Sequence, residues 1–167
     1  MFAFKQDNET QTLIHYLKYK GFNKLGVFLG ELLSKELVKE FQTELETFEY
    51  LIPVPLYAAK VRERGYNQSD YICRGMNDLL KKKYCYDLVN RIKNTKSQTK
   101  LKSRERIENV KDAFELNHKY SPIIQHKNII VVDDVITSGS TINEVISTLK
   151  KNKAGKIFSV SLATASF

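Results

Sequence analysis

Hydrophobic and polar residues follow a helical period over the first third of the chain. The spacing predicts a short helix over residues 10–20, ending at Gly21, and a long amphipathic helix over residues 24 to about 48. Glu and Lys fill one side of the long helix, so we expect its apolar side to pack in the core. That apolar side consists of Leu25, Phe28, Leu29, Leu32, Leu37, Phe41, Leu45 and Phe48. Residues 1–49 are therefore expected to form an N-terminal helical segment.

Beyond residue 49 the pattern changes to short β-type runs separated by helical stretches. The expected strands are residues 50–55, 85–92, 113–116, 129–132 and 156–164, and the expected helices are residues 67–82, 103–111 and 141–152. Residues 129–132 are apolar and β-branched, which is typical of a central parallel strand covered on both faces. A strand, a helix and a second strand in this order predict a right-handed βαβ unit. We expect one α/β domain over residues 1–167, with three layers: a mostly parallel, twisted sheet and helices on both faces.

Residues 131–141 combine an apolar strand, two adjacent carboxylates and a hydroxyl-rich loop that opens a helix. The carboxylates are Asp133 and Asp134, and the loop contains Thr137, Ser138, Gly139, Ser140 and Thr141. Ligands of open α/β sheets bind beyond the carboxyl ends of the strands. Hydroxyls, backbone N–H groups and a helix N-terminus together favour a phosphate group. The carboxylates would be repelled by that phosphate, so we expect them to face sugar hydroxyls or a hydrated Mg²⁺.

Each half of this pattern has a simpler interpretation when taken alone. A Ser/Thr/Gly loop is often only a helix N-cap, and an Asp at a strand end is often a turn residue. The joint pattern of strand, acidic pair, hydroxyl loop and helix is more specific. It predicts a site for a ribose phosphate.

The chain carries a formal net charge of +8. This charge permits a polyanionic partner, either nucleic acid or a phosphate-rich small molecule, but it also fits a solvated basic surface. No apolar run is long enough for a transmembrane helix, and the first residues do not resemble a signal peptide. We therefore expect a cytoplasmic protein without membrane insertion.

Residues 133–141 resemble the signature for phosphoribosyl pyrophosphate (PRPP) of type I phosphoribosyltransferases. Further blocks are similar to the competence-associated ComF/GntX branch of that superfamily. These blocks are Leu17-Lys18-Tyr19-Lys20-Gly21, then Ile52-Pro53-Val54-Pro55-Leu56 followed by Arg62-Glu63-Arg64-Gly65-Tyr66-Asn67-Gln68, and finally Arg91, Thr95, Gln98, Arg104, Asn109 and Phe114. Many members of the branch carry an N-terminal zinc ribbon of four cysteines, which this sequence lacks.

The resemblance implies a type I phosphoribosyltransferase fold and a role for each part of the site. Asp133 and Asp134 would be the catalytic pair, contacting the ribose hydroxyls and, through water or the ribose, Mg²⁺. The 5′-phosphate would lie on Thr137, Ser138, Gly139, Ser140 and Thr141. The diphosphate would meet Lys60, Arg62 and Arg64, whose alternative role is in surface ion pairs, for instance with Glu63.

The resemblance also implies a mobile basic loop over residues 91–112, with Arg91, Lys96, Lys100 and Arg104 as its cations. In the superfamily such a loop closes over PRPP and excludes water. A nucleic-acid groove and a solvated loop are two other interpretations of the same charges. The sequence alone does not separate the three.

Three functions follow from these expectations. The first is an enzyme that transfers a phosphoribosyl group from PRPP to an unidentified nitrogen acceptor and releases pyrophosphate. The second is a non-catalytic protein that binds PRPP or another ribose-5-phosphate nucleotide together with single-stranded DNA, and acts with competence-machinery proteins in DNA uptake. Tyr66, Tyr84 and Tyr86 would be its stacking faces unless they pack in the core. The third is a PRPP-sensing regulator.

Overall fold

A five-stranded parallel sheet forms the centre of the molecule. The computed structural model describes residues 2–5, 8–95 and 108–164, with side chains from residue 12 onward. The strands lie in the order β1-β7-β6-β2-β3, and every neighbouring pair is parallel. Their bounds are β1 Phe2–Lys5, β2 Tyr50–Pro53, β3 Lys83–Tyr84, β6 Ile129–Ile136 and β7 Ile157–Thr164. A separate antiparallel pair consists of β4 (Val89–Arg91) and β5 (Phe114–Leu116).

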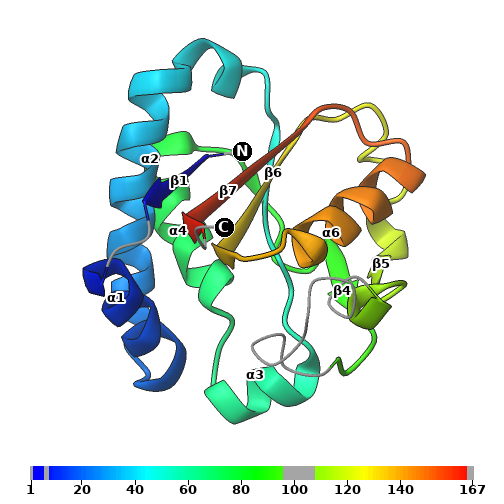
Figure 1. The fold of residues 1–167 in the computed structure, drawn as a ribbon. Coiled ribbons are helices and arrows are strands. Elements are labelled where there is room, and N and C mark those ends of the chain that lie inside the picture. Colours follow the sequence, from blue (N-terminus) through cyan, green and yellow to red (C-terminus); the bar gives the residue numbers. More distant parts are fainter. Residues whose placement is uncertain (1, 6–7, 96–107, 165–167) are drawn as a thin grey trace.

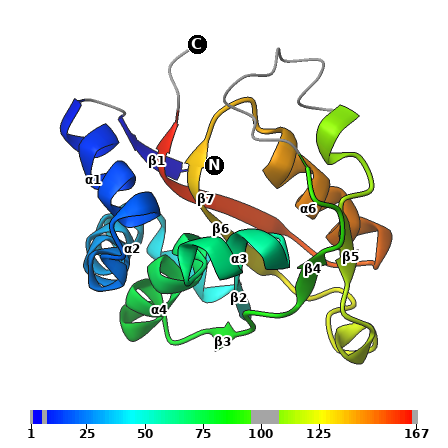
Figure 2. The same ribbon diagram turned by 90° about the horizontal axis from the view of Figure 1, so that it is seen from below.

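Helices cover both faces of the sheet and complete three layers (Figure 1). The helices are α1 Asn8–Tyr19, α2 Asn23–Glu46, α3 Ala58–Arg64, α4 Gln68–Leu80 and α6 Ser140–Lys151, with a 3-10 turn at His118–Tyr120. Figure 2 shows α2 and α4 on one side of the sheet, and α6 with the β4–β5 pair on the other. The expected three-layer α/β architecture is confirmed.

The central strands are apolar on both faces because both faces are covered. Ile130 and Val132 point into the cluster formed with α2 and α4, whereas Ile129 and Val131 point into the cluster formed with α6 and β5. All four side chains are fully buried. A parallel strand in this position needs no polar face, which is why residues 129–132 form a continuous apolar run.

Two glycines allow α2 and α4 to approach closely. A Cβ atom on Gly30 would lie 2.1 Å from the carbonyl oxygen of Ile72, and one on Gly75 would lie 1.9 Å from that of Val27. Any larger residue would push the two helices apart. The close packing positions α4, from which Ser69 reaches Asp133 on β6.

The structure differs from the sequence predictions in the N-terminal region. The segment 1–49, expected to be helical, also contains β1, which pairs with β7 at the edge of the sheet. Such a short strand is defined by its distant partner and leaves little local pattern. The apolar side of α2 is also only partly buried: Phe28 is 54% exposed, and Leu32 is exposed as well. The helix is kinked at Phe41, where the backbone leaves the helical range, so one straight stripe does not describe its buried face.

Three elements after residue 50 also differ from expectation. The basic stretch after β2, expected to be a loop, forms helix α3. Within the expected strand at residues 85–92 only Val89–Arg91 form a strand, β4, and the short strand β3 lies before this range. Of the helix expected at 103–111, residues 108–110 are helical and residues 103–107 lie outside the described part of the chain.

Strand β6 continues past the acidic pair, whereas the sequence predicted that it ends there. Pairing with β7 extends through Ile136, opposite Thr164. On its other edge, β6 pairs with β2 only as far as Val132, opposite Pro53. Beyond this point β2 turns away toward α3, and the last half of β6 is left open on that side.

Candidate phosphoribosyl site

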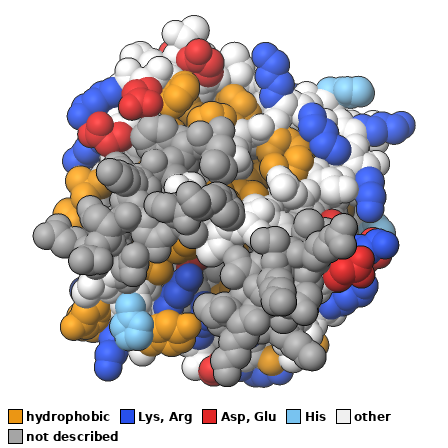
Figure 3. All heavy atoms as spheres, in the orientation of Figure 1, with side chains coloured by type: hydrophobic (Ala, Val, Ile, Leu, Met, Phe, Trp, Pro, Cys, Tyr) orange, Lys and Arg blue, Asp and Glu red, His pale blue; other side chains and the backbone are white. Residues whose placement is uncertain are grey.

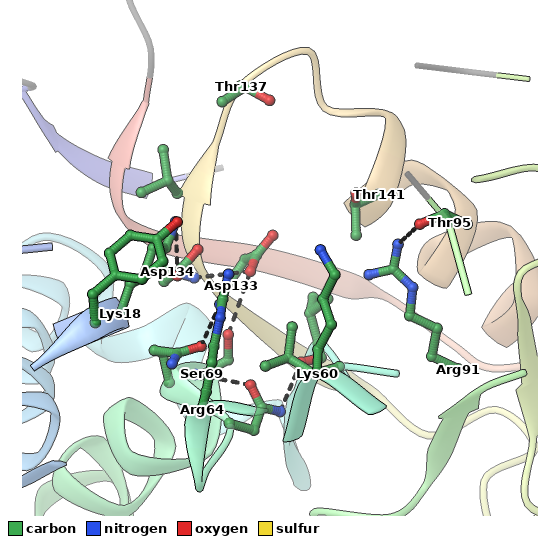
Figure 4. A pocket seen from close by; sticks show the side chains of 16 residues that line it. Lys18, Lys60, Arg64, Ser69, Arg91, Thr95, Asp133, Asp134, Thr137 and Thr141 are labelled. Carbon is green, nitrogen blue, oxygen red and sulfur yellow. Dashed lines mark hydrogen bonds and ion pairs between the residues drawn. The ribbon is translucent and has the colours of Figure 1, made fainter. Parts of the chain in front are cut away.

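A cavity of about 350 Å³ opens beside the free edge of β6, beyond the end of β2. Figure 4 shows its walls: the acidic pair lies in the middle, the end of α1 on one side, and Thr141 with Arg91 on the other. Seven of the residues expected to form the site line this cavity: Lys60, Arg64, Arg91, Asp133, Asp134, Thr137 and Thr141. The structure therefore gathers one surface from β6, α3, β4 and the start of α6.

The two carboxylates are held by different partners. Ser69, near the start of α4, donates its hydroxyl to Asp133 Oδ1 at 3.3 Å, and the backbone N–H of Asp134 donates to the same oxygen at 2.9 Å. Lys18, in the last turn of α1, forms an ion pair with Asp134, with Nζ 3.0 Å from Oδ2. The pair is therefore fixed in place at the floor of the cavity before any ligand arrives.

Burial raises the pKa of Asp133 to about 7, and the neighbouring charge of Asp134 acts in the same direction. The backbone N–H of Asp134, the charge of Lys18 and the hydroxyl of Ser69 oppose this shift. A carboxylate in such surroundings gains when a hydroxyl donor or a cation approaches it. The pair is thus suited to a ligand that brings donors or positive charge.

The hydroxyl loop lies at the N-terminal end of α6. Gly139 has φ +74° and caps the helix, and this left-handed conformation favours glycine. Ser138 and Ser140 are joined by a hydrogen bond of 3.0 Å between their hydroxyls. Thr137, Gly139, Ser140 and Thr141 border a small hollow next to Asp133. Backbone N–H groups at a helix start and a ring of hydroxyls favour an anion of phosphate size.

Helix α3 separates the three cations expected to bind diphosphate. Lys60 and Arg64 are four residues apart, share one face of the helix and line the cavity. Arg62 lies on the other side of α3, in a neighbouring groove. None of the three forms an ion pair with Glu63 within the described residues.

Lys60, Arg64 and Arg91 form a cationic wall of the cavity, and their protein partners do not neutralise all of its positive charge. Burial lowers the pKa of Lys60, and the charges of Arg64, Arg91 and Lys18 lower it further, against an opposing effect of Glu63. Arg64 donates from Nη1 to Gln68 Oε1 at 3.0 Å, which is a neutral partner. An anionic ligand would relieve this repulsion.

Two buried donors in the cavity wall have no hydrogen-bond partner in the part of the chain that the structure describes. They are Nε2 of Gln68 and Nε of Arg91. Arg91 also donates from Nη2 to the hydroxyl of Thr95 and packs its guanidinium over the ring of Phe114. Unpaired buried donors are uncommon in folded proteins, and in a cavity wall they point to an acceptor supplied by a ligand.

The other cations of the expected basic loop, Lys96, Lys100 and Arg104, lie outside the described residues. The tyrosines suggested as stacking faces differ from one another. Tyr66 is buried, and its hydroxyl donates to the carbonyl oxygen of Leu17. Tyr84 is half-buried against the core. Tyr86 is 65% exposed and is the member of the three that offers a free face.

Sequence reasoning assigned no role to Lys18, Gln68 and Ser69, which the structure places in the site. Lys18 reaches Asp134, Gln68 holds Arg64, and Ser69 holds Asp133. Lys18 and Gln68 lie inside the blocks that resemble the ComF/GntX branch, so the signal was present in the sequence. The contacts of Lys18 and Ser69 with the acidic pair join segments far apart in the chain, which no local pattern predicts.

The acidic pair fits a magnesium ion that arrives with a phosphate ligand. Two adjacent carboxylates supply hard oxygen donors, and Mg²⁺ in phosphate sites is commonly bound by one or two carboxylates, water and substrate oxygens. Within the described residues no group of three or more His, Cys, Asp or Glu side chains gathers to hold a metal by itself. The same part of the chain contains no helix long and apolar enough to cross a bilayer.

Comparisons with known proteins agree with this geometry. The family model described as phosphoribosyl transferase domain matches residues 74–166, more than half of the chain. The chain is also similar to a solved hypoxanthine phosphoribosyltransferase from Trypanosoma cruzi, with a TM-score of 0.50 and 12% identity, over 85% of this chain and 64% of that one. That likeness concerns the fold.

Curated relatives identify the branch. The chain is 33% identical over 146 residues to the DNA utilization protein YhgH of Escherichia coli O6:H1, covering 87% of this chain and 63% of that protein. It is 37% identical over 108 residues to competence protein F of Haemophilus influenzae, covering 65% of this chain and 47% of that protein. The chain thus spans less than two thirds of the length of either relative. It belongs to the type I phosphoribosyltransferase superfamily, as a member of its ComF-type family.

Proposed function

We propose that the cavity binds PRPP, or a nucleotide with the same ribose 5-phosphate part, and that Mg²⁺ accompanies the diphosphate. The observation that carries this proposal is the order of three surfaces along the cavity and the small hollow beside it. A hydroxyl loop at a helix N-terminus, an acidic pair and a cationic wall lie side by side. A phosphate, a diol and a diphosphate complement these three surfaces in turn.

Each surface has a distinct task in this proposal. The loop from Thr137 to Thr141 binds the 5′-phosphate, and Asp133 and Asp134 accept hydrogen bonds from the ribose hydroxyls. Lys60, Arg64 and Arg91 bind the diphosphate, for which the guanidinium fork is especially suited. Bound Mg²⁺ would add positive charge at the diphosphate and the ribose hydroxyls.

The proposed reaction is transfer of the phosphoribosyl group to a nitrogen nucleophile. The bond from the anomeric carbon to the diphosphate oxygen breaks, a carbon–nitrogen bond forms, and the acceptor loses a proton. The protein contributes by fixing the ribose between its two anionic ends and by stabilising the charge that develops on the departing diphosphate. The cations of α3 are placed for that second role.

The opposite orientations of Arg64 and Arg62 provide a direct test. Arg64→Gln removes a cation that lines the cavity, and Arg62→Gln removes one from the same short helix that faces the neighbouring groove. We expect Arg64→Gln to weaken PRPP binding by about tenfold or more, since a charge-assisted hydrogen bond contributes about 1.5–3 kcal/mol. Arg62→Gln should leave the affinity near the wild-type value.

Isothermal titration of both variants measures the difference. Binding of ribose 5-phosphate, which lacks the diphosphate, serves as the internal control and should be similar in all three proteins. Equal PRPP affinities of the two variants would remove α3 from the diphosphate site.

A second candidate function is binding of single-stranded DNA in DNA uptake, with or without turnover of PRPP. The net charge of +8 favours it, as do relatives named for DNA utilization and competence. Competence-machinery proteins would then be partners. A PRPP-sensing regulator would use the same cavity without catalysis.

A further inference from the structure

Helix α1 and the turn after it expose a row of aromatic side chains to solvent. Tyr16 is 43% exposed, Tyr19 is 61% exposed and Phe22 is 55% exposed. The four rings lie one beside the next. Between ring centroids, Tyr19 is 5.0 Å from His15, His15 is 6.4 Å from Tyr16, and Tyr16 is 5.8 Å from Phe22. We call these four residues the α1 aromatic row.

One end of the row opens into the candidate site. Tyr19 lines the cavity, and the guanidinium of Arg64 lies 5.5 Å from the centre of its ring. The neighbouring residues fix this end firmly: Lys18 pairs with Asp134, and the carbonyl oxygen of Leu17 accepts a hydrogen bond from Tyr66. The row is therefore a fixed extension of the cavity wall along the outside of α1.

The surroundings of the row are basic. The sequence has no Asp or Glu from residue 10 to residue 30, while Lys18, Lys20 and Lys24 fall within that stretch. Figure 3 shows hydrophobic, histidine and basic side chains gathered over α1, at the lower left of the view. Lys18 is already paired with Asp134 in the cavity, which leaves Lys20 and Lys24 as the cations of this stretch. Rings beside these two cations suit a ligand that has both flat apolar faces and negative charge.

We propose that the α1 aromatic row is a stacking surface for the bases of a single-stranded nucleic acid. Unpaired bases present their faces to aromatic side chains, whereas a duplex hides them in its own stack. Lys20 and Lys24 supply contacts to the phosphate backbone, and such stacking is tolerant of sequence. The proposal rests on the second candidate function, binding of single-stranded DNA. The surface extends from the PRPP cavity along α1, and its use does not require turnover in the cavity.

The other exposed tyrosine is less suited to this role. Tyr86 lies in the groove on the far side of α3, next to Asp70 and Asp87. These two carboxylates offset the charges of Arg62 and Arg91 in the same lining, so this groove attracts a nucleic-acid backbone less than the row does. We therefore expect a single-stranded nucleic acid to bind at the α1 aromatic row and not in the groove that contains Tyr86.

The test measures fluorescence anisotropy of a labelled oligothymidylate with the full chain at fixed salt. The double variant Tyr16→Leu with Phe22→Leu keeps apolar side chains but removes two rings, and it avoids Tyr19, which lines the cavity. We expect its affinity to fall by about tenfold or more, which corresponds to the contribution of base stacking. The exchange Tyr16→Phe with Phe22→Tyr keeps both rings and should bind like the wild type.

Matched controls locate the surface. Phe28→Leu and Tyr86→Leu each remove an exposed ring outside the row and should leave the affinity unchanged. Wild-type affinity of the Tyr16→Leu, Phe22→Leu variant would overturn the proposal, as would a loss confined to Tyr86→Leu. The proposal would also be overturned if the wild type did not bind the oligonucleotide but self-associated in sedimentation experiments, and the double leucine variant did not. The row would then be a protein contact.

The PRPP titration separates this proposal from the function of the cavity. The double leucine variant should bind PRPP with wild-type affinity, because neither changed residue lines the cavity. Loss of PRPP binding in this variant would mean that the rings support the site structurally, and the stacking role would fall.

Discussion

Replacement of both Asp133 and Asp134 by asparagine should abolish Mg²⁺-dependent binding of PRPP, with a loss of affinity of at least about a hundredfold. The amides lose the charge that attracts the metal and weaken the hydrogen bonds from the ribose hydroxyls, and a hydrogen bond to a charged group contributes about 1.5–3 kcal/mol. Among the described residues that line the cavity, no other carboxylate could substitute for Asp133 and Asp134. Calorimetric titration with PRPP in the presence of Mg²⁺ measures the effect.

A stability measurement shows whether this loss is chemical or structural. The folded-state pKa of Asp133 lies near 7, above its ordinary value of 3.8. A raised folded pKa means that the stability linked to this group is present below pH 4 and is lost as the pH rises toward 7. The single variant Asp133→Asn should therefore unfold at a higher temperature than the wild type at pH 8, and the difference should shrink as the pH falls from 7 to 4. Unchanged PRPP affinity of a folded double variant would contradict the role of the pair.

A negative charge placed in the hydroxyl loop should prevent phosphate binding. Gly139 lies at the start of α6 with a positive φ, and asparagine and aspartate tolerate this conformation better than other side chains. Among the described residues, the one atom that a Cβ at this position would approach within 4 Å is Nδ2 of Asn143, at 3.5 Å. We expect Gly139→Asp to fold at the cost of some backbone strain and to add one charge beside the proposed phosphate, with a loss of affinity on the order of a hundredfold.

Gly139→Asn is the matched control, since it has nearly the same shape and no charge. Titration with ribose 5-phosphate isolates the phosphate surface from the diphosphate surface. The asparagine variant should lose far less affinity than the aspartate variant, and high salt should narrow the gap between them. Equal affinities for the two variants would place the phosphate elsewhere.

Local sequence patterns predicted the centre of the fold well. Residues 129–132 form a buried β-branched run, and the helix and strand that follow were expected from their own periodicity. Strand β1 and the full length of β6 depend on pairing with β7, which is a long-range property. The burial of α2 likewise depends on its glycine-mediated contact with α4 and on the kink at Phe41.

The site could be predicted where one segment carries its chemistry and not where several segments meet. Asp133, Asp134 and the hydroxyl loop are contiguous in the sequence, so their joint pattern was visible. The division between Arg64 and Arg62 required knowledge that the basic stretch is a helix, because in a loop all three cations are equivalent. The role of Lys18 required the position of α1, which is fixed by its contacts with Asp134 and Tyr66.

Calorimetric titration of the wild-type protein with PRPP, with and without Mg²⁺, tests the central claim most directly. The arrangement of the hydroxyl loop, acidic pair and cationic wall predicts saturable binding at one site per chain that strengthens when Mg²⁺ is present. Absence of saturable binding under both conditions would contradict the proposal that this cavity is a PRPP site.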